Sequence, residues 1–512
     1  AASDVYKRQG LNATENAREF MKVLYKILLI ITPLAIVVAA PLVLRDDETE
    51  GANEADMRLD VITPHTETLR REFGEAFSQY WQQKTGKSVY VNFLVPGGTS
   101  ECVRVINNGF EASIERGEDG CNADVFFGGG AYEYKKLAKL ERFEKLRIFD
   151  TQPELFKEGG IPQNLGGETF YDANLTWIGS VLSSFGICYN VDLLEDRGLS
   201  IPPSWDDLGD PGYVRGIALA DTTKSSSVTK ALEMLVQQKI QNELLNDVSG
   251  KSKKELIKLG WAKSLRLIQR IGANARYFTD SSSKIPRDVA QGNAIAGMCV
   301  DFYGRTTAES LKKQDGLSRV GYVMPPGGSS ISVDPIAVLK GAPHLDLAHS
   351  FVEFVLSKEG QMIWAAAPGS HPGPKYRALR RLPVRPDLYQ GETLGLMIDG
   401  SEMPFEQAKK FNYDGSLTGH LFTPLRIIVR VMCIDAHDEM KEAWEALIDS
   451  GFPPQATEKF HDISLVSYEL AGTSIKSTLK KSKVDAVKLM NELGSFFRKN
   501  YKEAKQLAEE GK

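Results

Sequence analysis

A run of serines and threonines at residues 222–235, TTKSSSVTKALEML, is the segment whose residue types most directly suggest binding chemistry. The run opens a predicted helix, where the first backbone N–H groups have no partner inside the helix. The helix dipole adds positive potential at that end, and Lys224 adds a full charge. We therefore predict a site for an anionic ligand formed by Ser225, Ser226 and Ser227. The alternative is an ordinary helix cap that binds no ligand.

Two glycine-containing loops lead into further predicted helices. One is PGGTSEC, in which Thr99 or Ser100 caps the helix, and the other is the triple glycine after ADVFF, which includes Gly129 and Gly130. Glycine has no side chain, so a ligand can approach the backbone of such a loop closely. We predict that both loops contact the ligand. Glycines at strand ends also form plain turns, which is the alternative for each loop.

Polar side chains follow two apolar runs. Asp301, Tyr303 and Arg305 come at the end of the run NAIAGMCVDFYG, which we interpret as a strand over 293–304. We expect at least one of the three to contact the ligand. A salt bridge between Asp301 and a neighbour is the alternative. His65, which follows a shorter run, is predicted either to contact the ligand or to be a simple turn residue.

Catalytic motifs are present only in fragments. Ser-x-x-Lys occurs repeatedly, as at Ser227/Lys230, Ser281/Lys284 and Ser477/Lys480, and Lys84-Thr85-Gly86 precedes every copy, whereas a penicillin-binding enzyme has Lys-Thr-Gly after its nucleophile. The sequence contains no Ser-Asp-Asn, no His-Glu-x-x-His and no Gly-x-Ser-x-Gly. No catalytic set is visible, so we predict that the protein is not an enzyme, with an extracytoplasmic enzyme as the remote alternative.

The N-terminal part predicts an attachment to a membrane. Residues 23–44 are almost all apolar, with Lys26 as the single charge, and about 20 such residues cross a bilayer. Basic residues in the tail 1–22 precede this stretch, which predicts that the tail stays in the cytoplasm. We predict an uncleaved transmembrane anchor followed by an acidic linker at 45–57; a cleaved signal peptide is the alternative. Both place the remainder in the periplasm or outside the cell, tethered to the cytoplasmic membrane in the first case.

The amino-acid composition excludes two further classes of protein. The 512 residues carry 62 Lys and Arg against 67 Asp and Glu, a balance that argues against nucleic acid as a partner. Five cysteines in this length exclude a scaffold built on disulfides. In an oxidising compartment, Cys102 with Cys121, and Cys188 with Cys299, are either bridged or separate thiols.

Strand-like and helix-like segments alternate along the chain, which predicts an α/β fold with a mostly parallel sheet. The ordered segments also resemble a known family, the extracellular solute-binding proteins of ABC importers, specifically their ferric-ion-binding branch. The resemblance covers residues 57–395 and rests on these pieces: ADVFFGGG, FGICYN, IPPSWDDL, the serine run, VDFYGR, VMPPGG and SKEGQ.

The resemblance implies a two-lobed periplasmic-binding-protein-like fold with the ligand between the lobes. We place lobe one at 57–184 and 313–400, and lobe two at 185–312. The predicted N-terminal transmembrane helix and a helical C-terminal extension at 401–512 are additions to the usual family pattern.

The resemblance further implies a receptor that captures an anionic or iron-containing ligand and delivers it to the membrane subunits of an ABC permease, without a cofactor. Ferric-ion binders of this kind use a histidine, a glutamate and two adjacent tyrosines. Here His65 and Tyr303 match as metal ligands, but Phe302 replaces one tyrosine and glycine stands in the glutamate position. Ferric ion, a ferric chelate and a metal-free anion therefore all stay open as ligands. A tethered sensory or partner-binding module with the same fold is the alternative function.

Overall fold

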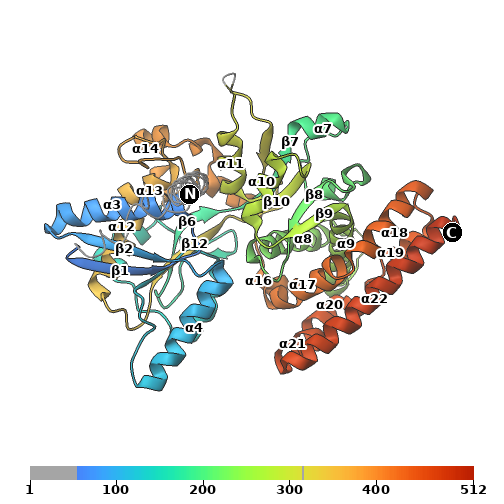
Figure 1. Ribbon diagram of the computed structural model, residues 1–512, viewed down its shortest axis with the longest axis horizontal. Helices are drawn as coiled ribbons and strands as arrows, with labels where there is room; N and C mark the ends of the chain where they lie inside the picture. The colour runs from blue at the N-terminus through green and yellow to red at the C-terminus, as the bar shows by residue number, and fades with distance from the viewer. Residues whose placement is uncertain (1–54, 249, 314–315) are drawn as a thin grey trace, which may run out of the picture. The chain divides into compact units, whose positions relative to one another are not determined.

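The computed structural model of the protein describes residues 55–248, 250–313 and 316–512. The predicted tail 1–22, the predicted transmembrane segment 23–44 and most of the predicted linker 45–57 lie outside the described residues. From residue 57 onward the chain builds two five-stranded sheets, each covered by helices on both faces (Figure 1). We call the parts around the two sheets lobe one and lobe two.

Lobe one is built on a mixed sheet. Its strands, in spatial order, are β2 (Val89–Leu94), β1 (Met57–Ile62), β3 (Val125–Phe127), β12 (Ser332–Val338) and β6 (Ile178–Ser183). The pairs β1–β2 and β1–β3 are parallel, whereas β12 is antiparallel to both of its neighbours. The main covering helices are α3 (Glu67–Thr85), α4 (Thr99–Arg116), α5 (Ala131–Lys139), α12 (Leu345–Leu356) and α13 (Lys358–Ala365). Shorter elements complete the lobe: α6 (Ile148–Thr151), α14 (Gly391–Leu396) and the hairpin of β4 (Asn164–Leu165) and β5 (Glu168–Thr169).

Lobe two repeats this plan. Its strands, in spatial order, are β11 (Val320–Val323), β7 (Phe185–Asn190), β10 (Ala296–Val300), β8 (Ile217–Ala220) and β9 (Ala275–Thr279). Strand β7 is antiparallel to β10 and β11, and β8 is parallel to β10 and β9. Its helices are α7 (Val191–Asp196), α8 (Ser226–Leu245), α9 (Lys253–Asn274), α10 (Ile285–Ala290) and α11 (Asp301–Ser310). The side chains of β7, β8 and β10 are buried on both sides, as expected for strands in the middle of a covered sheet.

Three sequence-based expectations need correction. The sheets are mixed rather than mostly parallel, because β7 and β12 each enter a sheet directly from the other lobe. The chain returns to lobe one after β11, not at residue 313, since β11 pairs with β7 of lobe two. The predicted strand at 293–304 ends at Val300, and α11 begins at Asp301.

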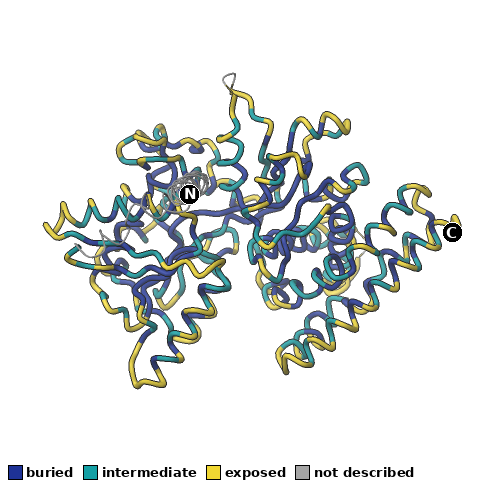
Figure 2. Tube along the Cα trace, in the orientation of Figure 1, coloured by how far each residue is buried: buried dark blue, intermediate teal, exposed yellow. Residues whose placement is uncertain are grey.

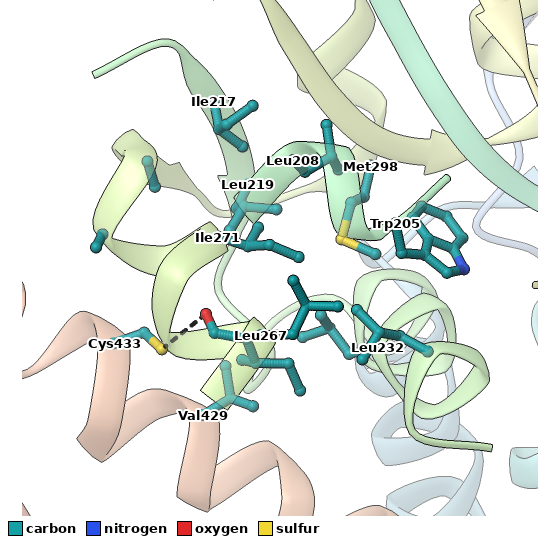
Figure 3. Packing of buried hydrophobic residues seen from close by; sticks show 14 of the residues in the cluster. Trp205, Leu208, Ile217, Leu219, Leu232, Leu267, Ile271, Met298, Val429 and Cys433 are labelled. Atoms are coloured by element: carbon teal, nitrogen blue, oxygen red, sulfur yellow. Dashed lines mark hydrogen bonds between the residues drawn. The ribbon is translucent and has the colours of Figure 1, made fainter. Parts of the chain in front are cut away.

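Residues 401–512 are helical and pack mainly on lobe two. Their helices are α15 (Pro404–Gln407), α16 (Gly415–Thr418), α17 (Phe422–Val429), α18 (His437–Ser450), α19 (Pro454–Phe460), α20 (Tyr468–Leu470), α21 (Lys476–Lys481) and α22 (Lys483–Glu509). We call this part the extension. Buried side chains of the extension, from Phe411 to Ala508, belong to the same hydrophobic cluster as the lobe-two sheet. Figure 3 shows Val429 and Cys433 against Leu267 and Ile271 of α9, with the Cys433 Sγ 3.8 Å from the Ile268 carbonyl oxygen.

Burial follows this division (Figure 2): the two sheets and the helix faces against them are dark, and the exposed residues lie in loops and on the outer faces of helices such as α4 and α22. Within the described part of the chain, one helical stretch, Gly415–Ile434, is long and apolar enough to cross a membrane. Of its most apolar window, 61% is buried inside the protein, which is typical of a core helix.

All five cysteines are free thiols in this structure. Cys102 is buried and Cys121 partly buried, and burial raises the pKa of Cys102 to about 12 and that of Cys121 to about 11. Cys188 and Cys299 lie on neighbouring strands of lobe two, where Cys188 Sγ is 3.5 Å from the Gly297 carbonyl oxygen. Cys102 and Cys121, and likewise Cys188 and Cys299, are therefore separate thiols in this structure and are not joined by a disulfide.

Candidate functional site

A cavity of about 1310 Å³ lies between the lobes. It is large for a small-molecule site, since such pockets usually hold about 300–1,000 Å³. Nine of the residues predicted to bind ligand line it: His65, Thr99, Ser100, Gly129, Gly130, Ser225, Ser226, Ser227 and Tyr303. Residues far apart in the sequence are thus brought together at one place.

Of the helices that begin at this cavity, three follow segments predicted to bind the ligand. Gly98 precedes α4 and Gly130 precedes α5, and neither residue has a side chain that could cap the helix. The third helix, α8, begins after Ser225, whose Oγ accepts a hydrogen bond from the Val228 N–H at 3.4 Å. Each helix start carries unsatisfied N–H groups and partial positive charge. The convergence of three such ends favours a negatively charged group between them.

The charged side chains of the cavity add to this field. Eight lysines line it, against six carboxylates. In the described residues, no carboxylate forms an ion pair with six of these lysines: Lys135, Lys136, Lys139, Lys224, Lys476 and Lys480. Lys135 is partly desolvated, and burial lowers its pKa. A bound anion would supply the missing negative charge.

The carboxylates of the cavity are, in contrast, mostly engaged. Glu133, on the first turn of α5, accepts a hydrogen bond at 3.1 Å from the Oγ of Ser226 on α8, so this bond joins the two lobes. Burial raises the pKa of Glu133, which the bond from Ser226 only partly offsets. A protonated Glu133 would no longer repel an anion beside it.

A buried cluster around Lys230 connects three parts of the protein at the edge of the cavity. Lys230 Nζ, on α8, lies 3.0 Å from Glu168 of the β4–β5 hairpin and 3.3 Å from Glu233. It also lies 3.7 Å from the ring centre of Tyr413, whose hydroxyl donates to Glu233 at 2.8 Å. Burial opposes the charge of Lys230, but the two carboxylates outweigh it and raise the lysine pKa.

His65 lies at the lobe-one wall. Its side chain is buried, its Nε2 has no hydrogen-bond partner among the described residues, and burial lowers its pKa well below the ordinary value. Gly128 lies against this ring: a Cβ at Gly128 would be 2.3 Å from His65 Nε2, and its φ of 94° also favours glycine. His65 is therefore held as a neutral imidazole at neutral pH.

Tyr303, on α11 of lobe two, lies near a buried pair formed by Arg381 and Asp334. Burial raises the pKa of Tyr303 to about 12, so its hydroxyl stays protonated. Arg381 donates to Asp334 at 2.6 Å, and its guanidinium lies 4.2 Å from the ring centre of Phe302. Asp334 and Phe302 both line the cavity. The ring at position 302 thus packs against an arginine.

The structure does not place Asp301 and Arg305 in the lining of the cavity. Both side chains are buried at the start of α11, where they face each other at 3.5 Å, and Arg305 also lies 3.4 Å from Glu402. The helix explains this pairing, because residues four apart lie on one face. Asp301 thus forms the salt bridge that was expected from the sequence as the alternative to ligand contact.

No group of three or more His, Cys, Asp and Glu side chains suited to a metal ion occurs in the residues that the structure describes. His65 and Tyr303 both line the cavity, and their predicted role as metal ligands stays a prediction.

Sequence reasoning missed several residues of the site. Lys230 was visible only as part of a common Ser-x-x-Lys pattern, and Glu133 stood a few residues after the position expected for a glutamate. The helical extension itself was predicted, but its part in the cavity was not. It lines the cavity with Tyr413, Gly415, Gly419, His420, Phe422, Thr423, Pro424, Lys476, Leu479 and Lys480. No local pattern connects these residues to segments 200 positions earlier.

A family model and two curated relatives match parts of the chain. The family model for bacterial extracellular solute-binding proteins matches residues 114–380. Phosphoglycerate transport regulatory protein PgtC of Salmonella typhimurium is 25% identical over 260 residues, which cover 49% of this chain and 56% of that protein. The chain thus spans about half the length of that relative. An uncharacterized protein of Haemophilus influenzae is 25% identical over 316 residues, 61% of this chain and 77% of that protein.

Solved structures of periplasmic binding proteins align with most of the chain. AfuA from Actinobacillus pleuropneumoniae, with fructose-6-phosphate bound, has a TM-score of 0.49 and 20% identity over 70% of this chain and 98% of its own. Iron-bound HitA from Pseudomonas aeruginosa has a TM-score of 0.46 and 18% identity over 73% of this chain and 99% of its own. These two structures hold different kinds of ligand.

Proposed function

Because the chain belongs to the bacterial extracellular solute-binding proteins, we propose that it captures a small phosphorylated anion between its lobes and hands it to an ABC permease. Proteins of this family are the solute-binding components of ABC transporters, typically without enzymatic activity, and they work in the periplasm or outside the cell. The phosphorylated, anionic class of the ligand is inferred from the convergence of three helix N-termini with unpaired lysines in one cavity.

A phosphoryl group suits this arrangement better than a bare metal ion. Its oxygens accept hydrogen bonds from the N–H groups at the starts of α4, α5 and α8, and from the hydroxyl of Ser227. Lysine is a common binder of phosphate as a point charge. The relative PgtC carries phosphoglycerate in its name, which supports the same ligand class.

Closure of the lobes is the step that traps the ligand. Two segments join the sheets, at Ser184 and at residues 324–331, and rotation about them would open the cavity. The bond between Ser226 and Glu133 already links the lobes next to the helix starts. A phosphoryl group between α5 and α8 would add further bonds to both lobes and favour the closed form.

Ligand-dependent thermal stability of the full chain, purified in detergent, tests the proposal. The panel is inorganic phosphate, 3-phosphoglycerate, fructose 6-phosphate, succinate, ferric citrate and ferric ion. A compound at about 100 times its dissociation constant adds about 2.7 kcal/mol to the stability, a readily measured shift. We expect at least one phosphorylated compound to stabilise the protein, and Ser226→Ala to weaken that effect.

Ser252→Ala is the matched control, because it removes a serine hydroxyl from the start of α9, outside the cavity. It should lower the melting temperature through the lost cap but leave ligand affinity unchanged. Stabilisation by ferric ion alone, weakened by Tyr303→Phe, would overturn the phosphorylated class and favour the metal-ligand prediction for His65 and Tyr303.

A sensory role is the second candidate function. PgtC is named a regulatory protein, and the extension offers a helical surface for a partner. In this case, deletion of the gene would abolish the response to the ligand and leave its uptake intact. Loss of uptake in the deletion strain would support the transport function.

A further inference from the structure

The extension supplies a third wall to the cavity, in addition to the two lobes. Ten of its residues line the space, from Tyr413 before α16 to Lys480 on α21. On the opposite side, the ring of Tyr132 on α5 packs 4.5 Å from the ring of Phe422, and the Tyr132 hydroxyl lies 3.2 Å from that of Thr423. The extension therefore contacts lobe one across the cavity as well as lobe two.

Two arginines of the extension hold the loop that leads into the serine run. Arg426, on α17, donates from Nε to the Thr222 carbonyl at 2.8 Å and from Nη2 to the Thr223 carbonyl at 2.6 Å. The Thr222 hydroxyl donates to the Arg426 carbonyl at 2.8 Å. Arg430 lies 3.5 Å from Asp221. The extension thus fixes both the position and the orientation of the start of α8.

Lys476 and Lys480 extend the positive charge of the cavity onto this wall. They are four residues apart on α21, so they lie on one face of the helix, with Leu479 beside them in the cavity lining. Like charges in this spacing repel each other, which disfavours the helix. Across the described part of the chain, no carboxylate pairs with either lysine, whereas the next lysine, Lys481, lies 3.8 Å from Asp485. Unlike Lys481, the two lysines have no nearby carboxylate among the described residues to offset their mutual repulsion.

We propose that Lys476 and Lys480 bind a second anionic group of the ligand, so that the ligand carries one anion at the helix starts and another at the extension. This inference rests on the proposed function of the cavity. It accounts for the cavity volume of about 1310 Å³, which exceeds what a lone phosphate needs. The ligand class is then a phosphorylated metabolite with a further phosphate or carboxylate, not inorganic phosphate.

Matched pairs of compounds test the inference by isothermal titration calorimetry on the full chain. 3-Phosphoglycerate is compared with glycerol 3-phosphate, and fructose 1,6-bisphosphate with fructose 6-phosphate; each pair differs by one anionic group. The expected result is that the member with two anionic groups binds more tightly in at least one pair. The double variant Lys476→Ala/Lys480→Ala should weaken that member by about tenfold or more and leave its partner within about twofold.

The double variant Lys481→Ala/Lys483→Ala is the control, since it removes two charges at the end of α21 and the start of α22, outside the cavity lining. It should not change the preference. Equal binding within both pairs, or an equal effect of the two double variants, overturns the inference. If Ser226→Ala still weakens binding in that case, the proposed function stands. Absence of binding by all four compounds overturns the inference and the phosphorylated class together.

Discussion

Replacement of Lys230 by methionine should destabilise the protein strongly. The lysine ammonium lies 3.0 Å from Glu168 and 3.3 Å from Glu233, and the three side chains are 20%, 6% and 2% exposed. Methionine keeps most of the volume of the lysine chain but none of its charge. Two carboxylates would then stay in a buried place with their shared cation removed.

The expected cost is about 3 kcal/mol, at the lower end of the range of 3–5 kcal/mol for breaking a buried ion pair, because Lys230 keeps some contact with water. Lys239→Met is the matched control on the same helix. Its ammonium bonds Asp206 at 2.6 Å, but the Asp206 side chain is 50% exposed. Removal of such a surface pair costs about 0–1 kcal/mol.

Urea unfolding followed by circular dichroism measures both changes as shifts in midpoint at unchanged slope. The variant Lys230→Met/Glu168→Gln should recover at least about 1 kcal/mol relative to Lys230→Met, because one of the two uncompensated charges is removed. A loss below about 0.5 kcal/mol for Lys230→Met, or a loss equal to that of Lys239→Met, would refute the view that the cluster is a desolvated ion pair.

Two further predictions concern the lobe-one wall. Gly128→Ala should lower the unfolding free energy by about 1–3 kcal/mol in the same urea assay, because its methyl group would stand 2.3 Å from His65 Nε2. Glu133→Gln should flatten the pH dependence of 3-phosphoglycerate affinity measured by calorimetry. Burial raises the pKa of Glu133, so in the wild-type protein its charge appears, and affinity falls, as the pH rises through that value.

The glycine prediction has a matched control, and the Glu133 prediction has an outcome that contradicts it. Gly86 also has a positive φ, of 74°, but open space around it, so Gly86→Ala reports the backbone strain without the clash. Equal losses for the two glycine variants would contradict the contact with His65. For Glu133, the raised pKa stabilises the fold below about pH 4.5, and this contribution is lost as the pH rises through the folded-state value. Identical affinity profiles for the wild type and Glu133→Gln would exclude Glu133 from the ligand's electrostatic surroundings.

The strands of the two sheets could be predicted from the sequence, but whether they run parallel or antiparallel could not. Runs such as FGICYN are apolar on both sides because helices cover both faces of the sheet, and the structure has β7 over Phe185–Asn190. Its antiparallel direction follows from the lobe crossing at Ser184, which is a long-range event without a local signal. A pattern of alternating segments alone therefore favours a parallel sheet wrongly.

The residues of the candidate site could be predicted where a single short segment of sequence is enough to identify them. Serines that open a helix are recognisable by themselves, and Ser225, Ser226 and Ser227 line the cavity. Asp301 was assigned to the end of a predicted strand, and Arg305 to the residue that follows it. On helix α11 the two side chains, four residues apart, form a pair. Contacts between distant segments, as between Arg426 and Thr222, depend on the folded arrangement and have no sequence signature.

Because lobe two and the extension share one hydrophobic core, the two lobes must complete their folding at different stages of synthesis. Lobe one gathers strands from residues 57 to 338, whereas the core around β8 and α9 also needs side chains as late as Ala508. A ribosome must therefore make the chain at least as far as Ala508 before the second lobe can close its interior. Until then, the apolar faces of α8 and α9 are exposed to whatever surrounds the growing chain. The protein is thus expected to need a chaperone during synthesis, and to finish its ligand cavity as the last step of its folding.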